Sequence, residues 1–172
     1  KDHWGLIFTE LLTAQMFATS VPAGSHRMME TELIRFLPDE IVIPDDQKLG
    51  VFDSYFKKLG YSVGSVSGKD IVGNDLPVLW AENQLSSDVI KQLHRLPDVE
   101  RSLYILFWYL KKNQERALDQ LKNIQFYQPD DYLILDSSTQ RNLEIIKNMQ
   151  DGTRKNTLFS VMDHAVTSMG SR

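Results

Sequence analysis

Strand-like and helix-like patterns alternate over the first 67 residues, and this alternation restricts the possible fold more than any other feature of the sequence. Residues 4–13 and 15–22 are apolar, rich in β-formers and separated by little, which predicts an antiparallel pair of strands. After this pair, expected helices and strands alternate along the chain, which predicts an α/β fold in which helices cover a sheet. The remaining expected elements are helices at residues 27–38 and 45–60 and strands at residues 40–46 and 61–67.

The rest of the chain favours helices. Residues 68–79 contain glycines and a proline and are expected to form a loop. A capping-box spacing, Ser137 to Gln140, indicates the start of one helix. The final helix carries an apolar stripe formed by Leu158, Val161, Met162, Ala165 and Met169. Helices are expected at residues 86–97, 98–122, 137–152 and 158–169, with a short strand and a turn at Pro129 within residues 124–136.

The helix expected at residues 98–122 changes character along its length. Residues 103–110 are apolar on nearly all sides, which predicts burial on more than one side. Beyond them only a stripe of Ala117, Leu118 and Leu121 remains. The aromatic residues of this helix have aliphatic neighbours and no interleaved basic residues, so they predict a core and not a surface on which nucleotides stack.

The composition excludes several kinds of site. The chain has 172 residues, a net charge of −4 and no cysteine, so disulfides, thiolate metal sites and cysteine nucleophiles are excluded. A stand-alone nucleic-acid binder usually has a basic excess, so any role on DNA is expected to be indirect. No apolar run approaches the roughly 20 residues that span a bilayer, and no contact with a membrane is expected.

Metal and nucleotide motifs are missing from the sequence. The four histidines, His3, His26, His94 and His164, have no metal-ligand spacing. Neither a P-loop nor a dinucleotide-binding glycine pattern is present. No catalytic, cofactor-binding or metal-binding residue is therefore predicted.

Three acidic residues near strand ends deserve comparison with a metal-dependent nuclease. Glu10 lies near the end of the first expected strand, and Asp45 and Asp46 follow the third. Two-metal hydrolysis needs several carboxylates that converge at one place. The sequence shows no such convergent set, and carboxylates at turns and helix starts are the simpler interpretation.

Two linked motifs lie in the C-terminal third of the sequence. The first is formed by Asp136, Thr139, Arg141, Asn142, Leu143 and Glu144. The second is formed, after a short loop, by Thr157, Leu158, Asp163, Thr167, Met169, Gly170 and Arg172. These motifs resemble D-x-x-[ST]-x-R-N-L-E and T-L-[LF]-x-[VL]-[LM]-D-x-x-x-T-x-M-G-x-R, which mark the start of the core (lever) domain in the MutS family of DNA mismatch-repair proteins.

The N-terminal part is similar to the same family. "ELIRFLPDEIVIP" resembles the family pattern E-L-x-R-x-x-P-x-E-I-x-x-P. "WGLIFTELLTAQMF" resembles its G-L-A-x-x-D-x-S-T-G-E-F strand pair, with Glu10, Leu12, Ala14 and Gln15 as departures. The resemblance covers essentially the whole chain and is weakest at residues 64–97.

The resemblance implies a fold and a domain organisation. A connector domain with a ribonuclease H-like mixed sheet and flanking helices is expected at residues 1–98. A long linking helix is expected at residues 99–128, and the start of the helical core domain at residues 129–172. In the family the mismatch-reading domain precedes such a stretch, one further strand joins the connector sheet, and the P-loop ATPase and dimerisation helices follow.

The resemblance also implies a function. The stretch is expected to be a non-catalytic connector that couples the ATPase to the mismatch-binding end, with the helix around residues 103–121 as the base of a lever. It is expected to offer a face to MutL around Lys57 and Lys58, although these lysines also fit a solvated helix end. The parent protein is expected to be a cytoplasmic, nucleoid-associated homodimer that meets mismatched DNA and binds ATP and Mg²⁺ elsewhere.

Two other functions are compatible with the sequence. One is a ribonuclease H-like, metal-dependent nuclease, and the other is a truncated paralogue that acts alone as a protein-interaction module. The abrupt end within the family's second motif suggests an experimental or proteolytic boundary. The final helix is then expected to pack against the helix at residues 98–122, to pack against another copy, or to be poorly ordered.

Overall fold

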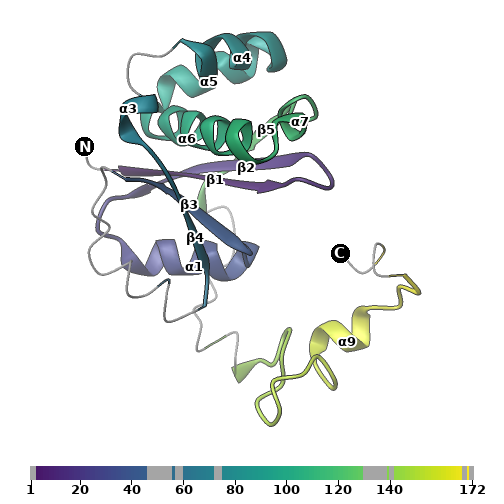
Figure 1. Cartoon of the computed structure of the whole chain (residues 1–172). Helices are drawn as coiled ribbons and strands as arrows, with labels where there is room; N and C mark the ends of the chain where they lie inside the picture. Colours follow the sequence, from purple (N-terminus) through teal and green to yellow (C-terminus); the bar gives the residue numbers. More distant parts are fainter. Residues whose placement is uncertain are drawn as a thin grey trace.

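The computed structural model describes residues 3–45, 56, 60–71, 75–129, 139, 142–167 and 170. Strands form the middle of an α/β unit (Figure 1). Helix α6 (Pro97–Asn113) covers one side of it, and helix α1 (His26–Phe36) covers the other. The mixed α/β class expected from the sequence is confirmed.

The larger sheet has three strands in the order β1-β2-β5. Strands β1 (His3–Glu10) and β2 (Gln15–Pro22) form an antiparallel hairpin in which Glu10 pairs with Gln15, as predicted. Strand β5 (Ile124–Phe126) is parallel to β2 and pairs Phe126 with Ala18. The sequence did not indicate this long-range pairing.

The second sheet has two parallel strands, β3 (Glu40–Pro44) and β4 (Ser62–Val66). Both were predicted. The helix expected between them at residues 45–60 lies almost entirely outside the described residues. The described strands thus form two sheets, and the ribonuclease H-like arrangement of a single mixed sheet stays a prediction.

The expected loop at residues 68–79 is wrong, because two helices occupy most of it. They are α3 (Gly68–Ile71) and α4 (Leu76–Gln84). Pro77 lies in the first turn of α4, where proline needs no hydrogen-bond partner and favours helix initiation. Helix α5 (Ser87–Arg95) follows as predicted, with Ser86 as its N-cap.

The single long helix expected at residues 98–122 is broken. Helix α6 ends at Asn113, and a short helix α7 (Glu115–Leu118) follows after Gln114, whose backbone is extended in φ (−149°). Gln114 is an exposed polar residue in the line of the apolar stripe. The change of direction allows Leu118 and Leu121 to reach the core, where both are buried.

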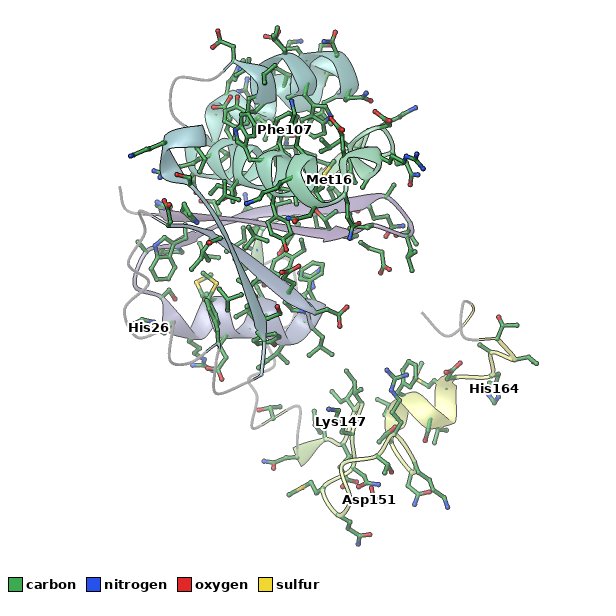
Figure 2. All side chains as sticks on the ribbon, viewed as in Figure 1. Met16, His26, Phe107, Lys147, Asp151 and His164 are labelled. Carbon is green, nitrogen blue, oxygen red and sulfur yellow. The ribbon has the colours of Figure 1, made fainter. Side chains whose placement is uncertain are left out.

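The main core lies between α6 and the larger sheet. Leu103, Phe107 and Leu110 of α6 pack there with Met16 of β2, and Figure 2 shows Phe107 and Met16 in this region. Ile105, on another side of α6, belongs to a second cluster with Val66. Burial of α6 on more than one side is therefore confirmed.

The C-terminal segment, residues 142–167, is less helical than expected. Residues 143–152 form turns and bends, and α9 (Leu158–Met162) spans only five residues of the predicted helix at 158–169. Asp163 ends it, because its Oδ1 accepts a hydrogen bond from the amide of Ala165 at 3.0 Å and thereby stabilises a turn. Val161 and Met162 are exposed. Figure 1 shows α9 away from α6, so the expected packing against that helix is wrong.

Candidate functional site

The two lysines predicted to face a partner, Lys57 and Lys58, lie outside the described residues. Their neighbour Phe56 is described and is buried against Met29 and Leu33 of α1. Its ring meets that of Tyr61 edge-on, with 6.5 Å between the ring centroids. The partner face around these lysines stays a prediction.

Of the acidic residues considered for a nuclease, the two that the structure describes, Glu10 and Asp45, belong to no metal-binding group. Within the described part of the chain, no group of three or more His, Asp or Glu side chains could hold a metal ion. Glu10 lies exposed at the hairpin end of β1. The Oδ1 atom of Asp45 accepts a hydrogen bond from the amide of Gly68 at 2.7 Å, which fixes the start of α3. Asp46 lies outside the described residues.

The histidines are scattered. Figure 2 shows His26 at the start of α1 and His164 in the C-terminal segment. Nε2 of His94 lies 3.6 Å from Oε1 of Glu100, at the junction of α5 and α6. None of these environments indicates a metal site.

The side-chain hydrogen bonds that join described residues far apart in the sequence lie mainly where the segment at residues 97–127 meets the preceding part. The first contact region is the start of α6 over β1. A Cβ atom on Gly5 would overlap the backbone carbonyl of Asp98, so only glycine allows this approach. Oγ of Ser102 donates to the carbonyl oxygen of Gly5 at 2.8 Å, and Oγ of Ser20 donates to the Asp98 carboxylate.

The second contact region joins α6 to the smaller sheet. The hydroxyl of Tyr109 donates to Oε1 of Glu40 at 2.6 Å, and this bond raises the pKa of Tyr109. Beneath the Tyr109 ring lies Gly64, where a Cβ atom would come within 2.8 Å of Cε2 of that ring. The absence of a side chain at residue 64 therefore makes room for the tyrosine.

The third contact region joins the end of β5 to α1. The hydroxyl of Tyr127 donates to Oε2 of Glu32 at 2.5 Å, and both side chains are buried. Arg35 lies beside them, with Nη1 at 3.7 Å from Oε2 of Glu32. Its guanidinium carbon lies 4.7 Å from the centroid of the Tyr127 ring, close enough for a cation–π contact.

These three regions hold elements in place through hydrogen bonds and close packing. Tyrosine hydroxyls donate to carboxylates in two of them, and charge-assisted bonds of this kind are stronger than neutral ones. Sequence reasoning missed all three pairings. A signal was available in "ELIRFLPDEIVIP", because Glu32, Arg35 and Glu40 occupy the polar positions of that pattern.

Curated proteins named "DNA mismatch repair protein MutS" align with this chain along its whole length. The protein from Pelotomaculum thermopropionicum is 31% identical over 183 residues, which cover 100% of this chain and 20% of the relative. The protein from Methanothrix thermoacetophila is 31% identical over 169 residues, which cover 98% of this chain and 18% of the relative. The chain belongs to the MutS family. A third MutS, from Acetivibrio thermocellus, is 27% identical and covers 100% of the chain.

The resemblance stated from the motifs is thereby confirmed. No family model matches the chain. The chain spans about a fifth of the length of the MutS relatives that it matches, at 20% of the first and 18% of the second. Among the described residues, no helix is both long and apolar enough to cross a bilayer.

Membership of the MutS family gives the three contact regions a context. Glu32, Arg35 and Glu40 occupy the polar positions of the family pattern quoted for residues 32–44, and each contacts a tyrosine of the segment at residues 97–127. Gly5 matches the glycine of the family's strand pair and lies under the start of α6. These contacts join residues 5–40 to residues 98–127.

Proposed function

We propose that this stretch of a MutS-type protein is a non-catalytic connector that passes movement between the parts of the protein on either side of it. The observation that carries the proposal is the anchoring of α6. This helix contacts both sheets and holds them through Gly5, Ser102 and Tyr109. A body that transmits movement must hold its parts in fixed relation, and α6 provides this through one attachment to the larger sheet and one to the smaller sheet.

The division into a connector domain at residues 1–98, a linking helix at 99–128 and a core segment at 129–172 belongs to this proposal. Packing of α6 on both sheets supports a linking segment that moves together with the first domain. ATP and Mg²⁺ would bind in other parts of the MutS protein, as would mismatched DNA, and the parent protein would be a homodimer in the nucleoid.

The proposal is tested in a MutS protein that contains this chain. Ser102→Ala combined with Tyr109→Phe removes one side-chain attachment of α6 to each sheet. We expect ATP-driven release from mismatched DNA to slow about ten-fold, because two hydrogen bonds, one of them to a carboxylate, are lost. ATP hydrolysis without DNA should not change. Lys112→Ala, on the exposed side of the same helix, is the matched control. Release at the wild-type rate in the double variant would refute the connector role.

A docking face for MutL around Lys57 and Lys58 is part of the same proposal. Its support is the resemblance of this stretch to the family's connector domain, in which the helix expected at residues 45–60 carries the two lysines. Lys57→Glu with Lys58→Glu should weaken recruitment of MutL, whereas Lys112→Glu with Lys122→Glu changes the charge equally at exposed positions elsewhere. Unchanged recruitment in the first pair would remove these lysines from the docking face.

A further inference from the structure

Strand β5 is attached to the larger sheet by little backbone pairing. It has three residues, and its register joins Met16 to Ile124, Phe17 to Gln125 and Ala18 to Phe126. One further backbone bond follows, in which the amide of Tyr127 donates to the carbonyl of Ala18 at 3.1 Å. So short a strand at the edge of a sheet opens more easily than the eight-residue hairpin of β1 and β2.

The side chain of Tyr127 adds an attachment on the opposite side of the sheet from α6. Glu32 has an exposed fraction of 3%. Its Oε2 atom accepts a hydrogen bond from the Tyr127 hydroxyl at 2.5 Å and lies 3.7 Å from Nη1 of Arg35. Phe36 extends this cluster, because its ring centroid lies 6.0 Å from that of Tyr127 and 4.0 Å from that of Phe8 in β1. Tyr127 is thus attached to α1 and, through Phe36, to β1.

Packing against α1 loosens directly after this point. A cavity of about 250 Å³ lies between α1 and Pro129, lined by Arg27, Met28, Thr31, Glu32 and Pro129. Glu32 therefore borders the cavity on one side and holds Tyr127 on the other. In the described part of the chain, Tyr127 is the last residue before the C-terminal segment whose side chain is buried against α1.

We propose that Glu32, Arg35 and Tyr127 form a releasable latch, named here the exit latch. When closed, it holds β5 in the sheet and Tyr127 against α1. When the Tyr127 hydroxyl leaves Glu32, β5 and Tyr127 separate from β2 together, while β1, β2 and α6 stay folded. The purpose of the latch, control over how movement enters the connector, rests on the proposed function, but its opening does not.

Arg35 keeps the open state accessible. Without a partner, a buried carboxylate is very unfavourable, and this would oppose release of the tyrosine. Arg35 lies 3.7 Å from Glu32 on the same helix and does not depend on β5 for its attachment to the chain, so it can serve as the ion-pair partner of the charge when Tyr127 departs. With two partners on one carboxylate, the latch can open at one of them.

Hydrogen exchange of single amides in this chain, followed by NMR, tests the latch. The amide of Tyr127 should exchange through a local opening whose rate does not respond to low concentrations of urea. Amides in the hairpin of β1 and β2 should exchange through larger unfolding events that urea accelerates. The same protection and the same response to urea for both sets would overturn the proposal, because Tyr127 would then be a static part of the fold.

Variants identify the bond that closes the latch. Tyr127→Phe should raise the exchange rate of the residue 127 amide by about ten- to a hundred-fold, the range expected for loss of a bond to a charged group. The exchange rates of amides in the hairpin of β1 and β2 should not change. Tyr109→Phe is the matched control, since it removes the other hydrogen bond between a tyrosine and a carboxylate and should leave residue 127 unaffected. Equal acceleration by both variants, or acceleration at all sites, would overturn the assignment.

A second variant keeps the test valid if Tyr127→Phe destabilises the whole chain. Glu32→Gln retains an acceptor for Tyr127 but loses the charge, so it should accelerate exchange at Tyr127 by a smaller factor. In the combined variant, the two effects should not multiply, because both changes act on one bond. Fully multiplicative effects would refute the latch. All these measurements use the chain without nucleotide or DNA, so they stand or fall independently of the connector role.

Discussion

Asp98 lies directly over Gly5, and the backbone of α6 comes so close to β1 that a Cβ atom on residue 5 would overlap the Asp98 carbonyl. The overlap is with backbone and not with a flexible side chain, so a substitution can be accommodated only if α6 shifts as a whole. Gly5→Ala should lower the free energy of unfolding by about 3 kcal/mol, as overpacking of a tight core contact does. Urea unfolding followed by circular dichroism measures this. Thr13→Ala, in the exposed hairpin turn, is the control, and equal stability of the two variants would contradict the prediction.

The carboxylate of Asp98 contributes separately from its backbone. It accepts a hydrogen bond from Ser20 and lies in the first turn of α6, where a negative charge interacts favourably with the helix dipole. Asp98→Ala should therefore cost about 1–2 kcal/mol. Asp98→Asn keeps an acceptor and should cost less. The same urea measurement decides, and a greater loss for asparagine than for alanine would contradict the role of the hydrogen bond.

The hydrogen bond between Tyr109 and Glu40 should make the stability of the folded chain depend on pH. Its hydrogen bond to Glu40, its burial and the charge of Glu40 raise its pKa above the usual 10.0. Because the pKa is higher in the folded chain than in the unfolded one, the contribution to stability is fully present below about pH 10 and is lost as the pH rises through the raised value. Tyr109→Phe should thus be less stable than wild type near pH 8, with the difference shrinking above about pH 10. A difference that does not vary with pH would argue against the bond.

The side chain of Asp163 determines where helix α9 ends. Its Oδ1 accepts from the amide of Ala165 and ends α9 at Met162, although the apolar stripe continues to Met169 in the sequence. Asp163→Ala removes this competitor, and α9 should extend by about one turn, since alanine has the best helix propensity. Backbone chemical shifts of residues 163–167 measure the extension. Thr157→Val, which removes the capping box at the other end, should instead shorten the helix, and unchanged shifts in both variants would contradict this account of the helix ends.

Local patterns predicted the elements that local chemistry determines. The strands at β1 to β4 and the helices α1 and α5 have clear periodicity and end at turn residues. Helix α4 was missed because Pro77 suggested a loop, although proline is well suited to a first helical turn. The break at Gln114 was missed because its cause is the direction in which Leu118 and Leu121 find the core, which no short window contains.

The contacts that matter most for the proposed function were not predictable in the same way. Tyr127 meets Glu32, and Tyr109 meets Glu40, across long stretches of sequence. A polar residue on an amphipathic helix gives no sign of its partner until the sheets have formed. The family pattern did single out Glu32, Arg35 and Glu40, but it could not say what they contact.

The parallel pairing of β5 with β2 has a consequence for synthesis of the protein. Residue 18 cannot find its partner until residue 126 has left the ribosome, so the edge of β2 that pairs with β5 stays open while the residues between them are translated. The side chain of Met16, which lies in one apolar cluster with Ile124 of β5, lacks that neighbour during the interval. This stretch should therefore depend on a chaperone more in its nascent form than its size suggests, and it should become independent soon after β5 emerges.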